Sequence, residues 1–580
     1  MILDYYQHEL ELLRFRSKHF AKLHPALAHM LSEESDDPDV ERILEGCAYL
    51  TANVRQKLDD EFPELIHALV NVIAPHYLRP VPSATIMAFT PRRGLNECLT
   101  IPRRTLLNSI EVEGTTCSFA TCSDVEIAPL EITGVLLARE KDNTGMLNIS
   151  FSTLNSLPLS QAVPKRLNLY CTGTYTEAAR RIKLLCLHAT KARIIPEEAP
   201  GAAPLVLHGK DIFSLTGFKE KNAVLPYPVQ SFPAFRYLQE FFMLPERFCQ
   251  VEMPGFENWT TRGTGQKFSI EISLENLPED LPSFSSQHLH LFATPAVNIF
   301  PMDGKPINLN LRKDKYTIVP DAGKASGQCT VYSVEKIMGI RQGESTPREY
   351  SRFVNLNPGD RPQPVYHLTT NITAANELQI KLSIGQMQGD VPVPEILSVS
   401  LLCTNGKLPE RLHAGDICMP TDSSPQLANF TNLRPPTASA LPPLGDNTLW
   451  RLLSHLFLNY LSVASTENIR SILKLYIFGR SGDNAAQVSN IGRIEGIQHL
   501  EVHSMQKLVH GELLRGKKID LVLKSENFAN DGDMFVFTAI LNTFLSSYAS
   551  VNTFTMMHMT DTNGHMDITC PARLGSRPQL

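Results

Sequence analysis

Residues 36–83 have the sequence DDPDVERILEGCAYLTANVRQKLDDEFPELIHALVNVIAPHYLRPVPS, the strongest helical pattern in the chain. Asp37 is a favourable N-cap, and Pro38 suits the first position of a helix. Apolar residues then recur at steps of three and four, which predicts one face of an amphipathic helix: Val40, Ile43, Leu44, Cys47, Leu50, Val54 and Leu58. We expect this helix to end at Asp59 and Asp60.

A second helix is predicted after Pro63, with Leu65, Ile66, Leu69, Val70 and Ile73 on its apolar face. Pro75 is expected to end it, because the residue before a proline is pushed out of the α region. Pro80 and Pro82 favour an extended exit. We interpret the whole stretch as a rigid elbow between an assembly helix and the β-rich part of the chain that follows.

The composition is that of a folded globular chain. Its 580 residues suggest about three or four domains. Lys and Arg number 54 against 60 Asp and Glu, a formal net charge of -6. This balance gives no general electrostatic reason to bind nucleic acid or acidic membranes.

Cysteine usage and hydropathy indicate a cytoplasmic location without membrane insertion. The 11 cysteines are irregularly spaced and include no CxxC pair, which is typical of reduced, buried thiols. The first residues, MILDYYQHELELL, lack the basic and apolar regions of a signal peptide. No apolar run is long enough to span a membrane.

The pattern along the chain predicts an α+β, multidomain fold. Residues 1–84 are expected to be helical, with a first helical region over 4–31. Residues 85–224 are predicted to be a first β-rich domain, with a hairpin turn at Glu113-Gly114 and a helix after Thr174. Residues 225–410 are predicted to be a second β-rich domain with an aromatic helix near 231–243. Both β-rich domains are expected to be sandwich-like or barrel-like. Residues 411–446 are predicted to be a proline-rich linker or extended crossover, and residues 447–580 a C-terminal α+β domain.

The sequence offers no catalytic constellation and no cofactor or metal site. It has no GxSxG elbow, no GxxxxGK[ST] loop and no HExxH pair. His499 and His503 could share a helix face, but their local pattern favours a strand. The paired carboxylates Asp36-Asp37 and Asp59-Asp60 fit helix ends better than acid–base chemistry. The aromatic stripe from Phe232 to Phe248 is interpreted as core rather than a ligand platform.

Motifs along nearly the whole chain resemble the TssF family of type VI secretion baseplate subunits, also called ImpG or VasA. In the first stretch they are DPDVERILEG (37–46), AYLTANVRQKLDDEFPEL (48–65) and PHYLRPVPS (75–83), preceded by YYQHELELLR (5–14). Further along come CSFAT (117–121), LPYPVQSFPAFRYLQEFFMLPERF (225–248), PAVNIF (295–300), YTIVPD (316–321), LLCTNGKLP (401–409), LWRLLSHLFLNYL (449–461) and YASVNTF (548–554). Their number and order make the resemblance specific.

Three positions depart from the family pattern. Phe235-Arg236-Tyr237-Leu238 stands where YRLL is usual, Asn405-Gly406 where asparagine-arginine is usual, and Ala234 where glycine is common. We interpret these as core or turn substitutions.

The resemblance implies a structural role without enzymatic activity. Family members pair with TssG in wedges, with two TssF copies per TssG, and contact TssK, TssE, the spike and the base of the sheath and tube. They are cytoplasmic and reach the inner face of the bacterial inner membrane through other subunits. The resemblance therefore predicts no cofactor, no nucleic acid and no direct membrane insertion for this chain.

The N-terminal helices carry the candidate partner contacts. Apolar residues lie on more than one helical face, so the helices cannot bury them all against each other. We expect Tyr5, Tyr6, Leu10, Leu13 and Tyr49 to enter a helical bundle with TssG or a second TssF copy. The alternative class is a carbohydrate-binding or tail-fibre-like β-module protein, which tandem β-rich domains would also suit.

Overall fold

The computed structural model describes Tyr6, Leu10 and Leu13 and then residues 38–575, apart from gaps at 141, 198–201, 210–211, 229–230, 311–312, 324–327, 342–345, 353–363, 374–376, 386–393, 445, 457–464, 480–483, 510–511 and 552. The chain forms two compact units. One comprises residues 1–73 and 445–450, and the other comprises residues 74–444 and 451–580. The predicted cap at Asp37 and most of the predicted helical region 4–31 lie outside the described residues.

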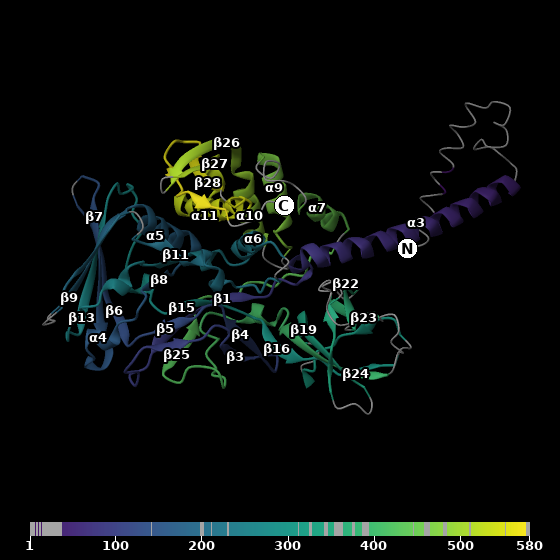
Figure 1. Cartoon of the computed structure of the whole chain (residues 1–580), viewed down its shortest axis with the longest axis horizontal. Coiled ribbons are helices and arrows are strands. Elements are labelled where there is room, and N and C mark those ends of the chain that lie inside the picture. The colour runs from purple at the N-terminus through teal and green to yellow at the C-terminus, as the bar shows by residue number, and fades with distance from the viewer. Residues whose placement is uncertain are drawn as a thin grey trace. The chain divides into compact units, whose positions relative to one another are not determined.

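The first unit is dominated by one long helix, α3 (Pro38–Ile73), drawn in purple in Figure 1. The predicted break between Asp59 and Pro63 is wrong, because the helix continues through both positions. A proline inside a helix removes one backbone hydrogen bond and costs about 3 kcal/mol. Helix formation is cooperative, so the intact turns on both sides of Pro63 offset this local cost.

The second unit begins with the proline-rich exit, where η2 (Pro75–Leu78) is a short 3-10 helix. The chain then enters β1 (Ala84–Pro91), whose first six residues are buried. β1 lies inside a five-stranded sheet of order β25-β1-β15-β4-β3. Its other strands are β25 (Ala428–Asn432), β15 (Ala293–Val297), β4 (Thr115–Thr121) and β3 (Leu106–Val112).

This sheet joins segments that are far apart in the sequence. β25 belongs to the proline-rich stretch 411–446, yet it pairs antiparallel with β1 from Met87↔Asn432 to Pro91↔Ala428. β15, from the predicted second β-rich domain, pairs with the other edge of β1. The predicted domain boundaries stay predictions. The hairpin between β3 and β4 is confirmed: Glu113 and Gly114 both have positive φ, as a two-residue hairpin turn requires.

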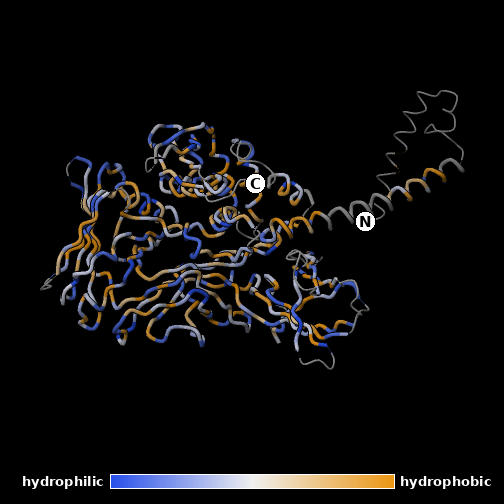
Figure 2. Tube along the Cα trace, in the orientation of Figure 1, coloured by the Kyte–Doolittle hydropathy of each residue, from blue (hydrophilic) through white to orange (hydrophobic). Residues whose placement is uncertain are grey.

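A second five-stranded antiparallel sheet has the order β10-β9-β13-β7-β6. Its strands are β10 (Leu205–His208), β9 (Ala189–Glu197), β13 (Lys267–Leu274), β7 (Gly145–Thr153) and β6 (Leu130–Arg139). β7 alternates strictly between buried and half-buried residues, so one face of it is in the core. Figure 2 shows the apolar residues along these strands.

The predicted helix after Thr174 is confirmed as α5 (Tyr175–Leu187), capped by the Thr174 hydroxyl. The second unit also contains two smaller groups of strands. The four-stranded sheet β11-β12-β8-β14 comprises β11 (Ser214–Leu215), β12 (Gln250–Glu252), β8 (Asn168–Cys171) and β14 (Leu289–His290). A separate pair is formed by β2 (Leu99–Ile101) and β5 (Val125–Ile127).

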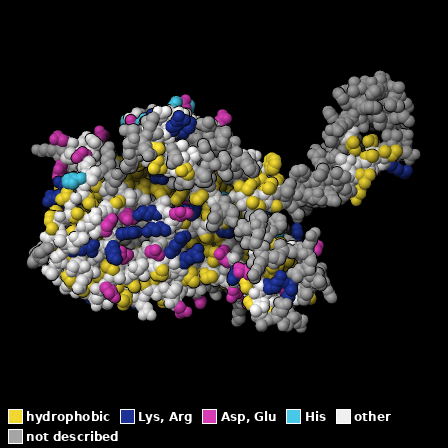
Figure 3. Space-filling view, viewed as in Figure 1, with side chains coloured by type: hydrophobic (Ala, Val, Ile, Leu, Met, Phe, Trp, Pro, Cys, Tyr) yellow, Lys and Arg dark blue, Asp and Glu magenta, His cyan; other side chains and the backbone are white. Residues whose placement is uncertain are grey.

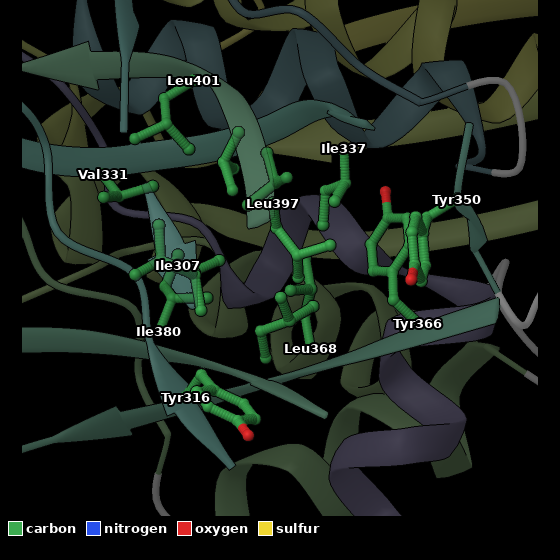
Figure 4. Packing of buried hydrophobic residues seen from close by; sticks show 14 of the residues in the cluster. Ile307, Tyr316, Val331, Ile337, Tyr350, Tyr366, Leu368, Ile380, Leu397 and Leu401 are labelled. Carbon is green, nitrogen blue, oxygen red and sulfur yellow. The ribbon is translucent and has the colours of Figure 1, made fainter. Parts of the chain in front are cut away.

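Two further sheets enclose an apolar core, shown in Figure 4. The first contains β16 (Phe300–Asp303), β17 (Ile307–Leu309), β24 (Glu395–Thr404), β19 (Thr330–Arg341) and β20 (Arg348–Glu349). The second contains β18 (Tyr316–Thr317), β23 (Leu378–Gly385), β22 (Val365–Ile372) and β21 (Ser351–Arg352). Ile337 and Leu397 of the first sheet meet Leu368 and Ile380 of the second. This facing of two sheets confirms a sandwich-like arrangement.

The C-terminal part is α+β, as predicted. β26 (Ile497–Val509), β27 (Glu512–Leu523), β28 (Thr553–Asp561) and β29 (Asp567–Thr569) form a sheet, and β30 (Arg573–Leu574) pairs with β28. The helices are α7 (Asp446–Leu456), α9 (Thr466–Leu475), α10 (Asn484–Glu495) and α11 (Asp531–Ser546). α10 was not predicted, because its polar sequence NAAQVSNIGRIE has only a weak apolar period.

The aromatic helix is confirmed as α6 (Pro233–Met243), two residues shorter at its start than expected. It is followed by the 3-10 helix η6 (Pro245–Phe248). Shorter helical turns complete the described elements: α4 (Leu159–Ala162), η3 (Leu154–Ser156), η4 (Thr216–Phe218), η5 (Glu220–Asn222), η7 (Phe256–Asn258), η8 (Ser286–His288), η11 (Leu408–Arg411) and η12 (Ser525–Asn527). No helix within the described ranges is both long enough and apolar enough to cross a membrane.

Candidate assembly surface and buried polar junctions

The candidate contact residues lie in the first unit. Tyr6, Leu10 and Leu13 have helical backbone and are half-buried, and their spacing of four and three places them on one helical face. Tyr49 lies on α3, and 52% of it is exposed. Tyr5 is outside the described residues.

An apolar stripe on α3, which we call the α3 apolar face, consists of Ile43, Cys47 and Leu50. Ile43 and Leu50 are each 66% exposed, and Cys47 is exposed as well. At 100° per residue, Ala48 and Ala52, both completely buried, lie on roughly the opposite side of the helix. These three residues of the predicted apolar face are therefore exposed to solvent in the isolated chain, whereas the opposite side of the helix is buried. An exposed apolar stripe of this kind is a candidate for a protein–protein contact.

Behind the proline-rich exit, the second unit contains a buried polar group that we call the His76 junction: His76, Tyr227, Ser231 and Tyr476. The imidazole Nδ1 of His76 lies 3.0 Å from the Ser231 hydroxyl, and its Nε2 lies 3.1 Å from the Tyr476 hydroxyl. The Tyr227 ring stacks on the imidazole at 4.4 Å between centroids. The junction joins the motif PHYL to the motif LPYPVQSFPAFRY, which are about 150 residues apart in the sequence.

Burial decides the chemistry of His76. Burial, with a smaller contribution from the Arg79 guanidinium, lowers the pKa of His76 to about 3. The ring is therefore neutral, with one nitrogen donating and the other accepting. Since both nitrogens are already in use and the side chain is only 2% exposed, His76 is a packing group and not a general base.

A second buried group surrounds α6. Glu240 forms an ion pair with Arg247, and its Oε1 accepts hydrogen bonds from the backbone N–H groups of Val224 (2.9 Å) and Leu225 (2.8 Å). Arg247 donates from its Nη2 atom to the carbonyls of Gly217 and Asn222. Burial lowers the pKa of Arg247 to about 9. These contacts hold both the segment before α6 and the 3-10 helix η6 after it against α6.

A third group links three helices. Arg493 of α10 donates through Nε to both carboxylate oxygens of Asp533 on α11, at 2.9 and 3.0 Å. The Tyr175 hydroxyl of α5 donates to Asp533 at 2.9 Å. Arg493 also stacks over the Tyr175 and Phe241 rings. The sequence did not predict these three buried polar groups. Its only signal for them was the presence of charged residues inside otherwise apolar motifs.

The structure agrees with the interpretation of the aromatic stripe and of the positions that depart from the family pattern. In the aromatic stripe, Phe235, Phe241 and Phe248 are buried and belong to the core. Ala234 is completely buried, and Gly406 occupies a turn with φ +57°. His499 and His503 lie on the strand β26, as expected. Over the described residues, no cluster of His, Cys, Asp and Glu side chains is arranged to hold a metal.

The family model described as "Type VI secretion system, TssF" matches residues 1–577. The chain belongs to the TssF family. It is 28% identical to the type VI secretion system component TssF1 of Pseudomonas aeruginosa, over 100% of this chain and 99% of that protein. As a family member it is a structural component of the type VI secretion baseplate and not an enzyme. The full-length match decides against the carbohydrate-binding or tail-fibre-like alternative.

Two solved structures resemble the fold of this TssF chain. One is the TssK-TssF-TssG baseplate subcomplex of the type VI secretion system, determined by cryo-electron microscopy. A chain of it matches with a TM-score of 0.75 and 26% identity, over 93% of this chain and 99% of that chain. The other is the baseplate complex from the type VI secretion system, with a TM-score of 0.59 and 23% identity over the full length of both chains, a likeness of fold.

Proposed function

We propose that this chain assembles with TssG and TssK in a baseplate wedge. The observation that carries the proposal is the match over 93% of the chain to a chain of the TssK-TssF-TssG subcomplex. Its internal construction supports a scaffold role: buried ion pairs and a neutral buried histidine connect distant segments, as expected for a part that has to keep its shape under load.

The α3 apolar face and the half-buried side of Tyr6, Leu10 and Leu13 are proposed to contact TssG or a second copy of this chain. Burying an apolar side chain that is exposed in the free protein contributes about 1.5–3 kcal/mol. A stripe of three such residues therefore favours association in a helical bundle, where residues at steps of three and four form the seam.

The finer arrangement follows from the family. We propose one TssG with two copies of this chain in each wedge, contacts to TssE, and a position around the spike at the base of the tube and sheath. The wedge would lie in the cytoplasm, at the inner face of the inner membrane, held there by other subunits. The free cysteines of the described residues are compatible with a reducing compartment.

A pull-down from cells that express the native secretion cluster tests the proposal. A tag on the C-terminus of this chain should recover TssG and TssK together, at constant ratios through size-exclusion chromatography. Recovery of neither protein from cells that produce all three would contradict the proposed function.

A further inference from the structure

A recess in the second unit, which we call the basic groove, has properties that the family role does not explain. It has a volume of about 340 Å³ and lies between the β2–β5 pair and the small sheet that contains β8, β11 and β12. Four cationic side chains line it: Lys165, Arg166, Lys219 and Lys221. Figure 3 shows Lys and Arg side chains gathered on this face of the molecule, over the region of β8, β11 and β15.

The carboxylates of the groove are engaged within the chain. Asp124 accepts the backbone N–H of Arg103 at 2.8 Å, and Glu126 accepts the backbone N–H of Lys165 at 3.2 Å. Glu252 forms an ion pair with Lys219. Each acidic group is therefore held by a neighbour in the folded chain.

Three of the cations are not engaged in this way. Lys165, Arg166 and Lys221 are exposed, and none of the described residues gives their side chains a hydrogen bond or an ion pair. Three like charges beside one recess repel each other, and an anion in the recess would relieve this repulsion. Four cations stand against three carboxylates in the lining, so the groove has a local charge of +1 and favours negative charge, although the chain as a whole carries a net charge of -6.

Other residues that line the groove favour a polypeptide over a small anion as its ligand. The side-chain oxygen of Asn168 is buried in the wall and has no donor among the described residues. A buried acceptor without a donor costs about 1–3 kcal/mol, so it favours a ligand that brings an N–H group. Peptide backbone supplies N–H groups, whereas a phosphate does not. Leu291 and Phe292 add an apolar strip to the same wall.

We propose that the basic groove binds an extended, carboxylate-rich segment of a neighbouring baseplate subunit. Lys165, Arg166 and Lys221 contact its carboxylates, and Asn168 accepts a hydrogen bond from its backbone. The proposal rests on the proposed function only in naming a baseplate subunit as the donor of the segment.

Fluorescence anisotropy with the purified full chain tests the proposal. The probe is a labelled ten-residue peptide of alternating Glu and Ser, and its matched control has Gln in place of Glu. We expect the Glu peptide to bind at least about tenfold more tightly, and its affinity to fall between 50 and 200 mM salt, since exposed charges are screened.

The triple variant Lys165→Glu, Arg166→Glu, Lys221→Glu should weaken binding of the Glu peptide by about tenfold or more. A matched triple variant at exposed cations outside the groove, Arg93→Glu, Lys267→Glu, Lys305→Glu, should bind within about twofold of the unaltered chain. All six positions are exposed, so neither variant should change the circular dichroism spectrum or the melting temperature.

Equal affinity for the Glu and Gln peptides, or equal losses in the two triple variants, would overturn the proposal. Tripolyphosphate that binds the groove as tightly as the Glu peptide would also overturn it, in favour of a small-anion site. Recovery of TssG and TssK with the unaltered chain is measured separately, so failure of the groove leaves the proposed function standing.

Discussion

The imidazole Nε2 of His76 lies 3.1 Å from the hydroxyl of Tyr476, which is 400 residues further along the chain. Both side chains are buried, and the Phe235 ring of α6 stacks on Tyr476 at 5.0 Å between centroids. The exit from the proline-rich stretch is therefore connected to the end of α9 and to α6, and the Tyr77 hydroxyl adds a hydrogen bond to the carbonyl of Leu475 at 2.8 Å. The arrangement requires a neutral imidazole, and its stability should consequently depend on pH.

Stability should decrease in mild acid because of His76. Its pKa is lowered to about 3 in the folded chain by burial and regains the ordinary value near 6.5 in the unfolded chain. Between these values the unfolded chain binds more protons, so the free energy of unfolding falls by up to about 1.4 kcal/mol for each pH unit below 6.5. Between pH 7 and pH 5, we expect the melting temperature of His76→Gln to fall less than that of the unaltered chain. The control is His208→Gln, an exposed histidine; parallel pH profiles for all three proteins would contradict the prediction.

Removing one partner of the buried ion pair should be costly. Glu240→Ala leaves the Arg247 guanidinium buried without its carboxylate, and we expect a loss of roughly 3–5 kcal/mol in the free energy of unfolding. Glu240→Gln keeps an acceptor for the N–H groups of Val224 and Leu225 and should cost less. The matched control is Asp280→Ala, which removes an exposed ion pair with Arg180 and should cost under about 1 kcal/mol. Urea unfolding followed by tryptophan fluorescence and circular dichroism measures all three, and equal costs for Glu240→Ala and Asp280→Ala would refute the role of burial.

Two glycines in helices should respond oppositely to alanine. A Cβ at Gly532 of α11 would lie 2.4 Å from the backbone nitrogen of Arg180 in α5, so Gly532→Ala must push two packed helices apart. We expect it to destabilise the fold by about 1–3 kcal/mol. Gly46 on α3 has open space at the same position, and Gly46→Ala should raise helix stability by about 0.5–1 kcal/mol. Differential scanning calorimetry measures both changes in melting temperature. A lower melting temperature for Gly46→Ala would show that a Cβ at this position clashes with a neighbour, which would contradict the prediction.

Charges on the α3 apolar face should prevent assembly without unfolding the chain. The double variant Ile43→Asp, Leu50→Asp places carboxylates where we expect a helical seam, so recovery of TssG should fall at least about tenfold. The control variant Leu136→Asp, Ile396→Asp changes two apolar residues of the second unit that are 67% and 54% exposed, and it should recover TssG normally. Equal recovery with both variants would exclude the α3 apolar face as the contact.

The other candidate contacts can be tested in the same assay. Tyr5→Asp combined with Leu10→Asp should abolish co-purification of TssG and leave the β-sheets folded, as judged by an unchanged melting transition. If co-purification persists, the N-terminal helical face does not enter the bundle.

Local signals in the sequence predicted many elements correctly. The helix α5 followed from its apolar period, and the hairpin at Glu113-Gly114 followed from turn chemistry. The same signals failed at Pro63, where cooperativity of a long helix outweighed a local break, and at α10, whose polar face hid the helical period. Tyr6, Leu10 and Leu13 could be placed on one helical face because an apolar stripe is a property of local spacing, and their role as contacts stays a prediction.

By itself, the sequence determined the family, the alternation of helical and β-rich segments and the absence of a recognisable catalytic motif, because these depend on residue types at short, fixed spacings. Only the tertiary structure decided which distant segments meet. β25 and β1 pair across more than 300 residues, and His76 meets Tyr476. It also decided that Ile43 and Leu50 of the opening stretch stay exposed while Ala48 and Ala52 are buried. Burial and long-range pairing are set by the packing of the whole chain, since every buried group needs a partner that local spacing does not specify.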